Sequence, residues 1–163
     1  MAQSQPQGDQ REELSLSKAS EYLLEECRMV LPGIQALFGF QLVAIFNQRF
    51  GELLSAAEQK LHLLAIALVA VAVALVMSPA AYHRQVGPRL LTERFLNIST
   101  RLLLWSMLPL AVGICIDFYL IARIILDGFI ASILTAALFI VFIFFWFALP
   151  RTESLKRLIS KRE

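Results

Sequence analysis

Residues 102–149 have the sequence LLLWSMLPLAVGICIDFYLIA-RIILD-GFIASILTAALFIVFIFFWFAL. Two apolar runs, 102–122 and 128–149, flank a short link, and the only charged side chain within either run is Asp117. A run of about 20 apolar residues forms a helix of roughly 30 Å, which matches the thickness of a bilayer core. The stretch therefore predicts two antiparallel membrane-spanning helices joined at Asp127-Gly128.

Two further apolar runs precede this stretch, at about 29–47 and 61–81. The chain of 163 residues is 58% hydrophobic and 17% charged, whereas soluble domains are about 45–50% apolar and about 25% charged. The expected fold is an all-α membrane protein, an antiparallel bundle of four transmembrane helices. A three-helix alternative stays open, in which the first run, interrupted by Pro32 and Gly33, is a re-entrant segment.

The segments outside the runs are polar. Residues 1–13 have the composition of a disordered tail. Apolar residues recur at helical spacing over 14–28, which predicts a short N-terminal amphipathic helix on the membrane surface or the base of the bundle. The membrane domain is expected to cover 14–150, with a basic cytoplasmic tail at 151–163. The capping-box pattern from Ser55 to Glu58 predicts the start of the second helix.

The distribution of Lys and Arg predicts the orientation of the chain. Of the 15 such residues, all but Arg49, Lys60 and Arg123 lie in the N-terminal segment, the second loop or the C-terminal tail. The positive-inside rule then places both termini in the cytoplasm, for a multi-pass protein of the cell (inner) membrane. Anionic lipid is the expected partner of the basic cytoplasmic segments, and nucleic acid is not.

Each apolar run carries small or polar residues along one helical face. These stripes are Glu25, Arg28, Pro32, Gln35 and Gly39 in the first run; Ala67, Ala70, Ala74 and Ser78 in the second; Ser106, Pro109, Gly113 and Asp117 in the third; Gly128, Ser132 and Thr135 in the fourth. Because small residues let helix backbones approach closely, the stripes are expected to be packing seams that face one another. A homo-oligomer is also expected.

Asp117 is the most informative single residue. A carboxylate in the membrane interior costs about 2.5–3.5 kcal/mol on insertion scales, so this side chain should face the bundle interior or water. Two hypotheses remain open. Asp117 belongs to an ion or proton pathway, with Gln35, Gln41 or Ser106 as neighbours, or it forms a structural hydrogen bond between helices.

The remaining polar residues give weaker predictions. Glu25 and Arg28 are expected to pair where the first helix enters the membrane, and Arg123 and Asp127 to pair at the opposite boundary. His62 follows Glu58 at i, i+4 spacing, but two ligands are too few to predict a metal site. Cys27 and Cys115 have no partners at metal-ligand spacing, so neither a disulfide framework nor a zinc site is expected.

Three stretches together resemble a known family. They are EECRMVLPGIQALFGF at 25–40, FNQRF at 46–50 and AYHR at 81–84. The family comprises small bacterial four-helix membrane proteins of unknown function, and the resemblance extends over about 21–150. It implies a four-helix membrane protein and supplies no site residues. Its members are often labelled sodium:proton antiporter, which we treat as a hypothesis because known antiporter folds have many more helices.

The sequence contains no nucleophile motif and no Gly-rich phosphate loop. A membrane enzyme therefore has little support, and neither a cofactor nor catalytic residues are expected. Two functions remain. The first is a structural or accessory membrane protein that acts through helix contacts. The alternative is an oligomeric small cation or proton transporter that uses Asp117.

Overall fold

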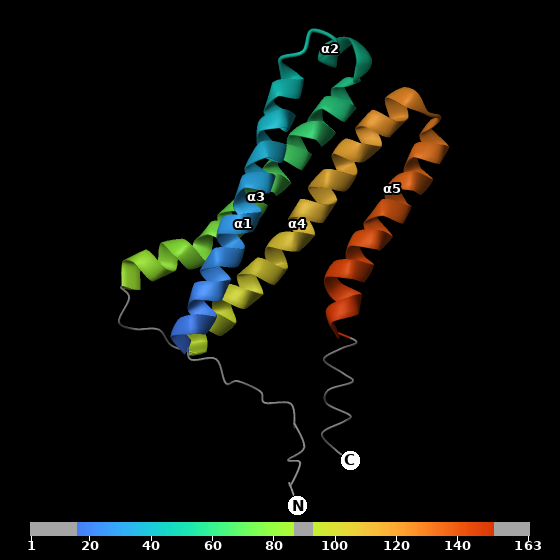
Figure 1. Ribbon diagram of the computed structural model, residues 1–163. Coiled ribbons are helices and arrows are strands. Elements are labelled where there is room, and N and C mark those ends of the chain that lie inside the picture. Colours follow the sequence, from blue (N-terminus) through green and yellow to red (C-terminus); the bar gives the residue numbers. More distant parts are fainter. Residues whose placement is uncertain (1–15, 87–92, 152–163) are drawn as a thin grey trace, which may run out of the picture.

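The computed structural model describes residues 16–86 and 93–151 (Figure 1). Regular structure in these ranges is helical throughout: α1 Leu16–Ile45, α2 Phe50–Leu53, α3 Ala56–Val86, α4 Glu93–Ile125, α5 Gly128–Ile143 and a π-helical segment, η1, Phe144–Ala148. The predicted tail at 1–13, and the predicted basic tail beyond Arg151, lie outside the described residues.

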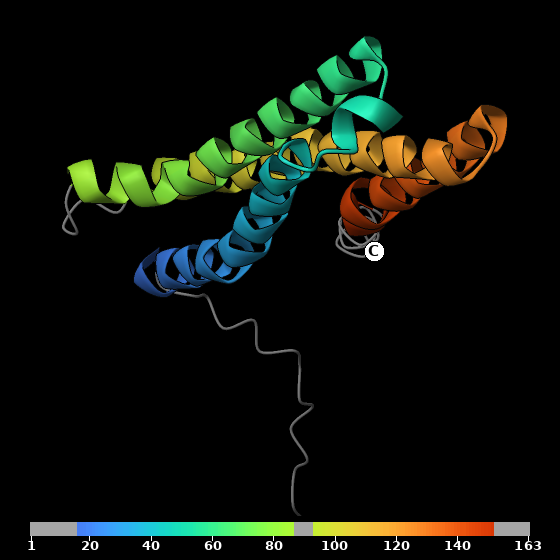
Figure 2. The same cartoon turned by 90° about the horizontal axis from the view of Figure 1, so that it is seen from above.

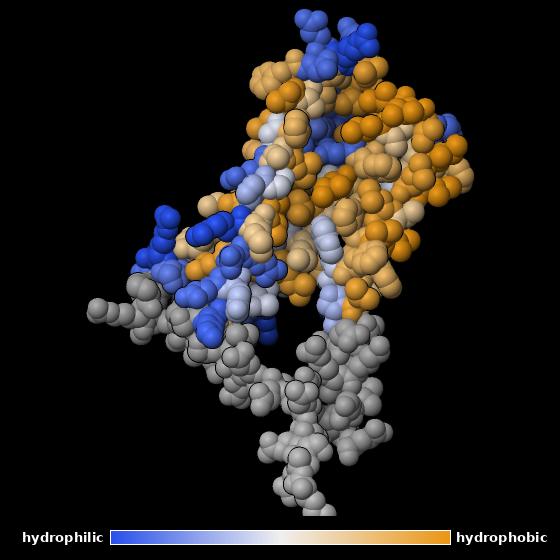
Figure 3. All heavy atoms as spheres, viewed as in Figure 1, coloured by the Kyte–Doolittle hydropathy of each residue, from blue (hydrophilic) through white to orange (hydrophobic). Residues whose placement is uncertain are grey.

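Four helices are long and apolar enough to cross a membrane: Lys18–Ile45, Ala56–Gln85, Arg94–Ile125 and Gly128–Arg151. Hydrophobic residues dominate the middle of the face shown in Figure 3, as expected for a surface that contacts lipid. The chain is thus an all-α, multi-pass membrane protein with four spans, and the prediction of four transmembrane helices is confirmed.

The amphipathic segment is the first half of α1 rather than a separate helix. Leu23 and Cys27 from this segment are buried together with Ile34 from the apolar run, against Val69 and Val76 of α3. One continuous helix keeps these side chains on a common face, which two helices with a break between them would not do. Figure 2 shows that α1 bends partway along, and Pro32 lies within it, where its missing N–H favours a bend.

Helices α3 and α4 form the most extensive contact of the fold, with α1 packed mainly on α3 and α5 on α4. In both ribbon views α5 lies beside α4 (Figures 1 and 2). The connection between α4 and α5 is the tight link that the sequence predicts, because α4 ends at Ile125 and α5 begins at Gly128.

The polar stripe of α4 faces α3 at Gly113 and Asp117, but it does not meet the stripe predicted on α3. Ser106 and Gly113 on this stripe are buried. A Cβ atom added to Gly113 would lie 3.0 Å from Val69 Cγ2 and 3.2 Å from the carbonyl oxygen of Ala65. Because the second neighbour is backbone, a Cβ atom would fit at this crossing only if the two helices moved apart by a few tenths of an ångström, and a larger side chain would need more room.

The predicted seam on α3 is wrong. Ala67, Ala70 and Ala74 are exposed, and the buried face of α3 consists of Ala65, Ile66, Val69, Ala72, Val76 and Pro79. Val69 lies opposite Gly113. Two alanines, Ala65 and Ala72, do lie on the buried face, so the small residues that pack are not those of the predicted stripe.

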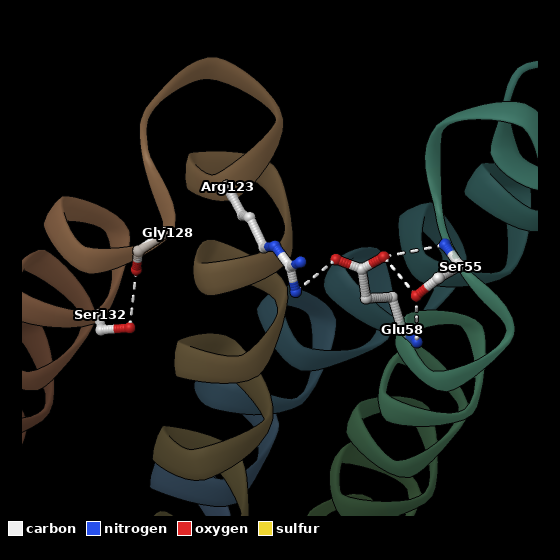
Figure 4. A network of polar contacts seen from close by, with 5 residues as sticks. All are labelled: Ser55, Glu58, Arg123, Gly128 and Ser132. Carbon is white, nitrogen blue, oxygen red and sulfur yellow. Dashed lines mark hydrogen bonds and ion pairs between the residues drawn. The ribbon is translucent and has the colours of Figure 1, made fainter.

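The α5 stripe is mostly an internal feature of that helix. Ser132 donates to the carbonyl oxygen of Gly128, and Thr135 to that of Ala131, each at 2.8 Å. Figure 4 shows the Ser132 contact. Because these hydroxyls bond their own helix, they need no partner on another helix.

The start of α3 has the predicted capping box. The backbone N–H of Ser55 donates to Glu58 Oε2 at 2.8 Å, and the backbone N–H of Glu58 lies 3.4 Å from Ser55 Oγ. The other carboxylate oxygen of Glu58 lies 2.9 Å from Arg123 Nη1 (Figure 4). This ion pair joins the start of α3 to the end of α4.

The predicted pair of Arg123 with Asp127 is therefore wrong. The i, i+4 relation requires both residues to be helical, but α4 ends at Ile125 and Asp127 has an extended backbone, with φ −62° and ψ 145°. Asp127 is instead the residue that precedes α5.

Replacing Gly113 with leucine should destabilise the fold, because the added side chain would collide with α3. Overpacking of this kind costs about 1–3 kcal/mol. The measurement is the free energy of unfolding of the purified protein in mixed micelles. Gly33→Leu is the matched control, since a Cβ atom at Gly33 meets nothing within 4 Å. Equal stability of the two variants would contradict the close contact at Gly113.

Candidate functional site

Asp117 lies at a junction of three helices. Its Oδ1 atom is 3.0 Å from Nδ1 of His62 on α3, and its Oδ2 atom accepts a hydrogen bond from Nε2 of Gln41 on α1. The side chain of Asp117 is 16% exposed and that of His62 is 8% exposed. Both carboxylate oxygens therefore have partners from neighbouring helices.

His62 has a second partner on the opposite side of its ring. Nε2 lies 3.0 Å from the backbone carbonyl oxygen of Gln41, and the ring packs at a centroid distance of 5.3 Å from that of Phe50 on α2. The histidine thus connects α1 with α4, and α2 covers it from the end of the bundle.

Both contacts of the His62 ring are hydrogen bonds only when the His62–Asp117 pair holds two protons. The Gln41 carbonyl oxygen can only accept, so Nε2 of His62 must carry a proton. The contact between Nδ1 and Asp117 Oδ1 needs one more proton, carried either by the imidazolium or by the carboxylic acid. In both arrangements the pair of side chains is neutral overall. Without that proton, a nitrogen lone pair would face a carboxylate at 3.0 Å.

The three side chains lie at similar depths in the fold. Gln41 is close to the end of α1, His62 follows the start of α3, and Asp117 precedes the end of α4. At 1.5 Å per residue these positions are roughly 6–12 Å from the helix ends next to α2. The group is therefore inside the membrane-spanning region, nearer to the α2 end than to the opposite end.

A cavity of about 390 Å³ adjoins the site. Its walls are mostly apolar side chains of α1, α2 and α4, including Phe40, Leu53 and Ile121, and its polar lining includes Gln41, His62 and Asp117. Figure 3 shows hydrophilic residues between hydrophobic surfaces near the α2 end of the molecule. The His62–Asp117 pair is therefore part of the polar lining of a cavity whose other walls are mostly apolar.

Gln41 leaves one acceptor unused. Its Oε1 atom is buried and has no hydrogen-bond partner among the described residues. The residue as a whole is 4% exposed. Less than 1 Å² of this atom is accessible, so a donor in the cavity does not reach it in this arrangement, and leaving it unpaired is costly.

The three residues predicted as neighbours of Asp117 lie at different places in the structure. Gln41 contacts it directly. Gln35 lies on the exposed side of α1. Ser106 is buried on α4, but it donates to the carbonyl oxygen of Leu103 at 2.7 Å, and 11 residues of helix, roughly 16 Å, separate it from Asp117.

The sequence pattern did not predict His62 in this group. The side chain of Glu58, four residues before His62, contacts Ser55 and Arg123 instead. A comparison of depth could have found the histidine, because His62 and Asp117 are similarly distant from the ends of antiparallel helices. Within residues 16–86 and 93–151, no group of three or more His, Cys, Asp or Glu residues could hold a metal ion.

The boundary charges Glu25 and Arg28 are both exposed on α1. The predicted ion pair between them is absent from the described part of the chain, where the salt bridges found involve His62 with Asp117 and Arg123 with Glu58. These two residues take no part in the site at Asp117.

No curated protein and no solved structure matches the chain. A family model described as a family of unknown function, DUF6328, matches residues 10–150. That description assigns no activity, so it does not bear on the antiporter label. The match covers most of the chain and confirms the resemblance to a family of unknown function: the protein belongs to the DUF6328 family.

Proposed function

We propose that the protein is a small proton-coupled transporter that binds and releases a proton at the His62–Asp117 pair. The observation that carries this proposal is the contact of both His62 ring nitrogens with oxygen atoms. The arrangement requires a proton shared by α3 and α4. A titratable pair inside the membrane is costly to maintain and is most often found on an ion or proton pathway.

Proton loss would change both charge and helix contact. The pair would acquire one negative charge in surroundings that are mostly apolar. The one proton left on the imidazole could then serve only one of two oxygen atoms, so His62 would lose its hydrogen bond either to Asp117 on α4 or to the Gln41 carbonyl on α1. Proton binding is therefore coupled to the contacts of α3 with its neighbouring helices, as a transporter requires.

The cavity supplies access from one side. If the Lys and Arg distribution sets the orientation, the termini are cytoplasmic in the inner membrane and the cavity lies toward the opposite face. On the cytoplasmic side of the site, the buried cluster of Leu23, Cys27, Ile34, Val69 and Val76 closes the interior. Transport then requires a second arrangement in which this cluster opens.

A purely structural or accessory role explains the site less well. A structural hydrogen bond between helices needs neither two titratable groups nor an adjoining cavity with an unused acceptor. An enzymatic role gains no support from this site, because no serine, threonine, cysteine or lysine is among the described residues that line the cavity. We therefore favour transport, and the accessory role is the outcome if no flux is found.

Asp117→Asn should abolish proton flux, because an amide cannot carry the shared proton. The measurement is proton uptake by liposomes that hold the purified protein and an internal pH-sensitive dye, under an imposed pH gradient. Asp127→Asn is the matched control, since it removes an exposed acid at the same end of the bundle. Flux from the wild type no greater than from protein-free liposomes would refute transport.

His62→Gln should abolish the same flux while the protein still inserts and folds, because glutamine can hydrogen-bond at this position but cannot take up a proton. His83→Gln is the control on the same helix, since His83 lies at the other end of α3 near Phe95. If His62→Gln kept wild-type flux and Asp117→Asn lost it, the carboxylate alone would carry the proton, and the histidine would only position it.

A further inference from the structure

The α1 polar stripe, which consists of Glu25, Arg28, Pro32, Gln35 and Gly39, faces away from the helices of its own chain. The first four of these residues are exposed and Gly39 is half-buried. Their spacing of three and four residues alternates as in a helix that packs along a second helix over its length. The stripe is thus a regular surface that nothing in the described chain covers.

Gln35 lies where an uncovered amide is most costly. It is ten residues from Ile45, the end of the α1 span, or about 15 Å at the rise of an α-helix. That distance is close to the middle of a hydrocarbon core of about 30 Å. The Gln35 side chain has no hydrogen-bond partner among the described residues, and lipid tails can offer none.

Other features of the same stripe also favour contact with a second helix. Pro32 has no N–H, so the carbonyl oxygen of Arg28 lacks its usual helical donor. Glu25 and Arg28 have opposite charges but do not pair within the described chain. A Cβ atom added at Gly39 would meet nothing within 4 Å, so another backbone can approach closely there.

We propose that a second copy of this chain packs parallel to the first along the α1 polar stripe. In a two-fold dimer with its axis along the membrane normal, each residue meets its counterpart at the same depth. The Gln35 amide is both donor and acceptor, so two copies satisfy each other. Glu25 of one copy lies within about one helical turn of Arg28 of the other.

A second copy fits this surface better than lipid or an unrelated helix. The stripe carries a self-complementary amide at the membrane centre and one acid and one base at its polar end, so a parallel copy gives the side chains of Glu25, Arg28 and Gln35 partners without any further protein. The dimer also leaves the cavity open, because the α1 residues that line it, including Leu37 and Gln41, lie on another face of the helix. The proposal is therefore independent of proton transport.

The first test is disulfide cross-linking of Gln35→Cys in liposomes at a high ratio of lipid to protein, with copper phenanthroline as oxidant. The two thiols of a parallel dimer would meet near the axis, within reach of a disulfide. Gly33→Cys is the matched control, because Gly33 is exposed on the same helix but lies off the stripe. The native thiols of Cys27 and Cys115 are buried, and wild-type protein measures their background.

Gln35→Cys should give a product of twice the chain mass, and Gly33→Cys should stay at the wild-type background. Equal yields from the two variants, or no product from either, would overturn the proposed interface. The same experiment in native membranes distinguishes a different partner, because a product of another mass from Gln35→Cys would replace the second copy with an unrelated protein.

A charge exchange tests the pairing without new thiols. Glu25→Arg and Arg28→Glu should each weaken the dimer about threefold to tenfold, as expected for loss of one polar contact between membrane helices. The double exchange should restore association, because opposite charges meet again. The measurement is energy transfer between differently labelled copies in liposomes, with Glu26→Arg as the control off the stripe. Failure of the double variant to recover would exclude the parallel register.

Discussion

The contact between Asp117 and His62 depends on the close crossing of α3 and α4 at Gly113. Gly113 approaches the backbone of Ala65 so closely that even a Cβ atom there would lie 3.2 Å from the Ala65 carbonyl oxygen. One turn beyond this crossing, Asp117 on α4 faces His62 on α3. An aspartate side chain is short, and it reaches the imidazole only because the two backbones are already close. The polar site is thus a consequence of a packing contact, and a wider crossing would separate Asp117 from His62.

Features that depend on local chemistry could be predicted from the sequence. The four spans follow from run length, the start of α3 from the Ser55–Glu58 capping box, and the α4–α5 hairpin from Asp127-Gly128. Asp117 is recognisable as a buried acid because a lone carboxylate in an apolar run needs a partner. Each of these inferences uses residues that are close in the chain, and the structure agrees with each.

The side of a helix that faces the protein could not be predicted in the same way. In water the apolar face is the buried one, but in lipid both faces are apolar, so hydrophobicity no longer distinguishes them. The alanine stripe of α3 therefore suggested a seam, although the branched face at Val69 and Val76 is the one buried. His62 was missed for a related reason. Its partners are 21 and 55 residues away, and only the helix contacts bring them together.

Helix α1 connects the two inferences about function. On one face it supplies both the amide and the carbonyl oxygen of Gln41 to the His62–Asp117 pair, and on another it carries the exposed polar stripe. If two copies join through that stripe, α1 becomes the fixed part of the assembly, because it is held by its neighbour. Loss of the shared proton would then change the contacts of α3 with α1 or α4, rather than move α1 itself. A stationary α1 pair beside mobile α3 and α4 would let each copy change its arrangement without breaking the dimer.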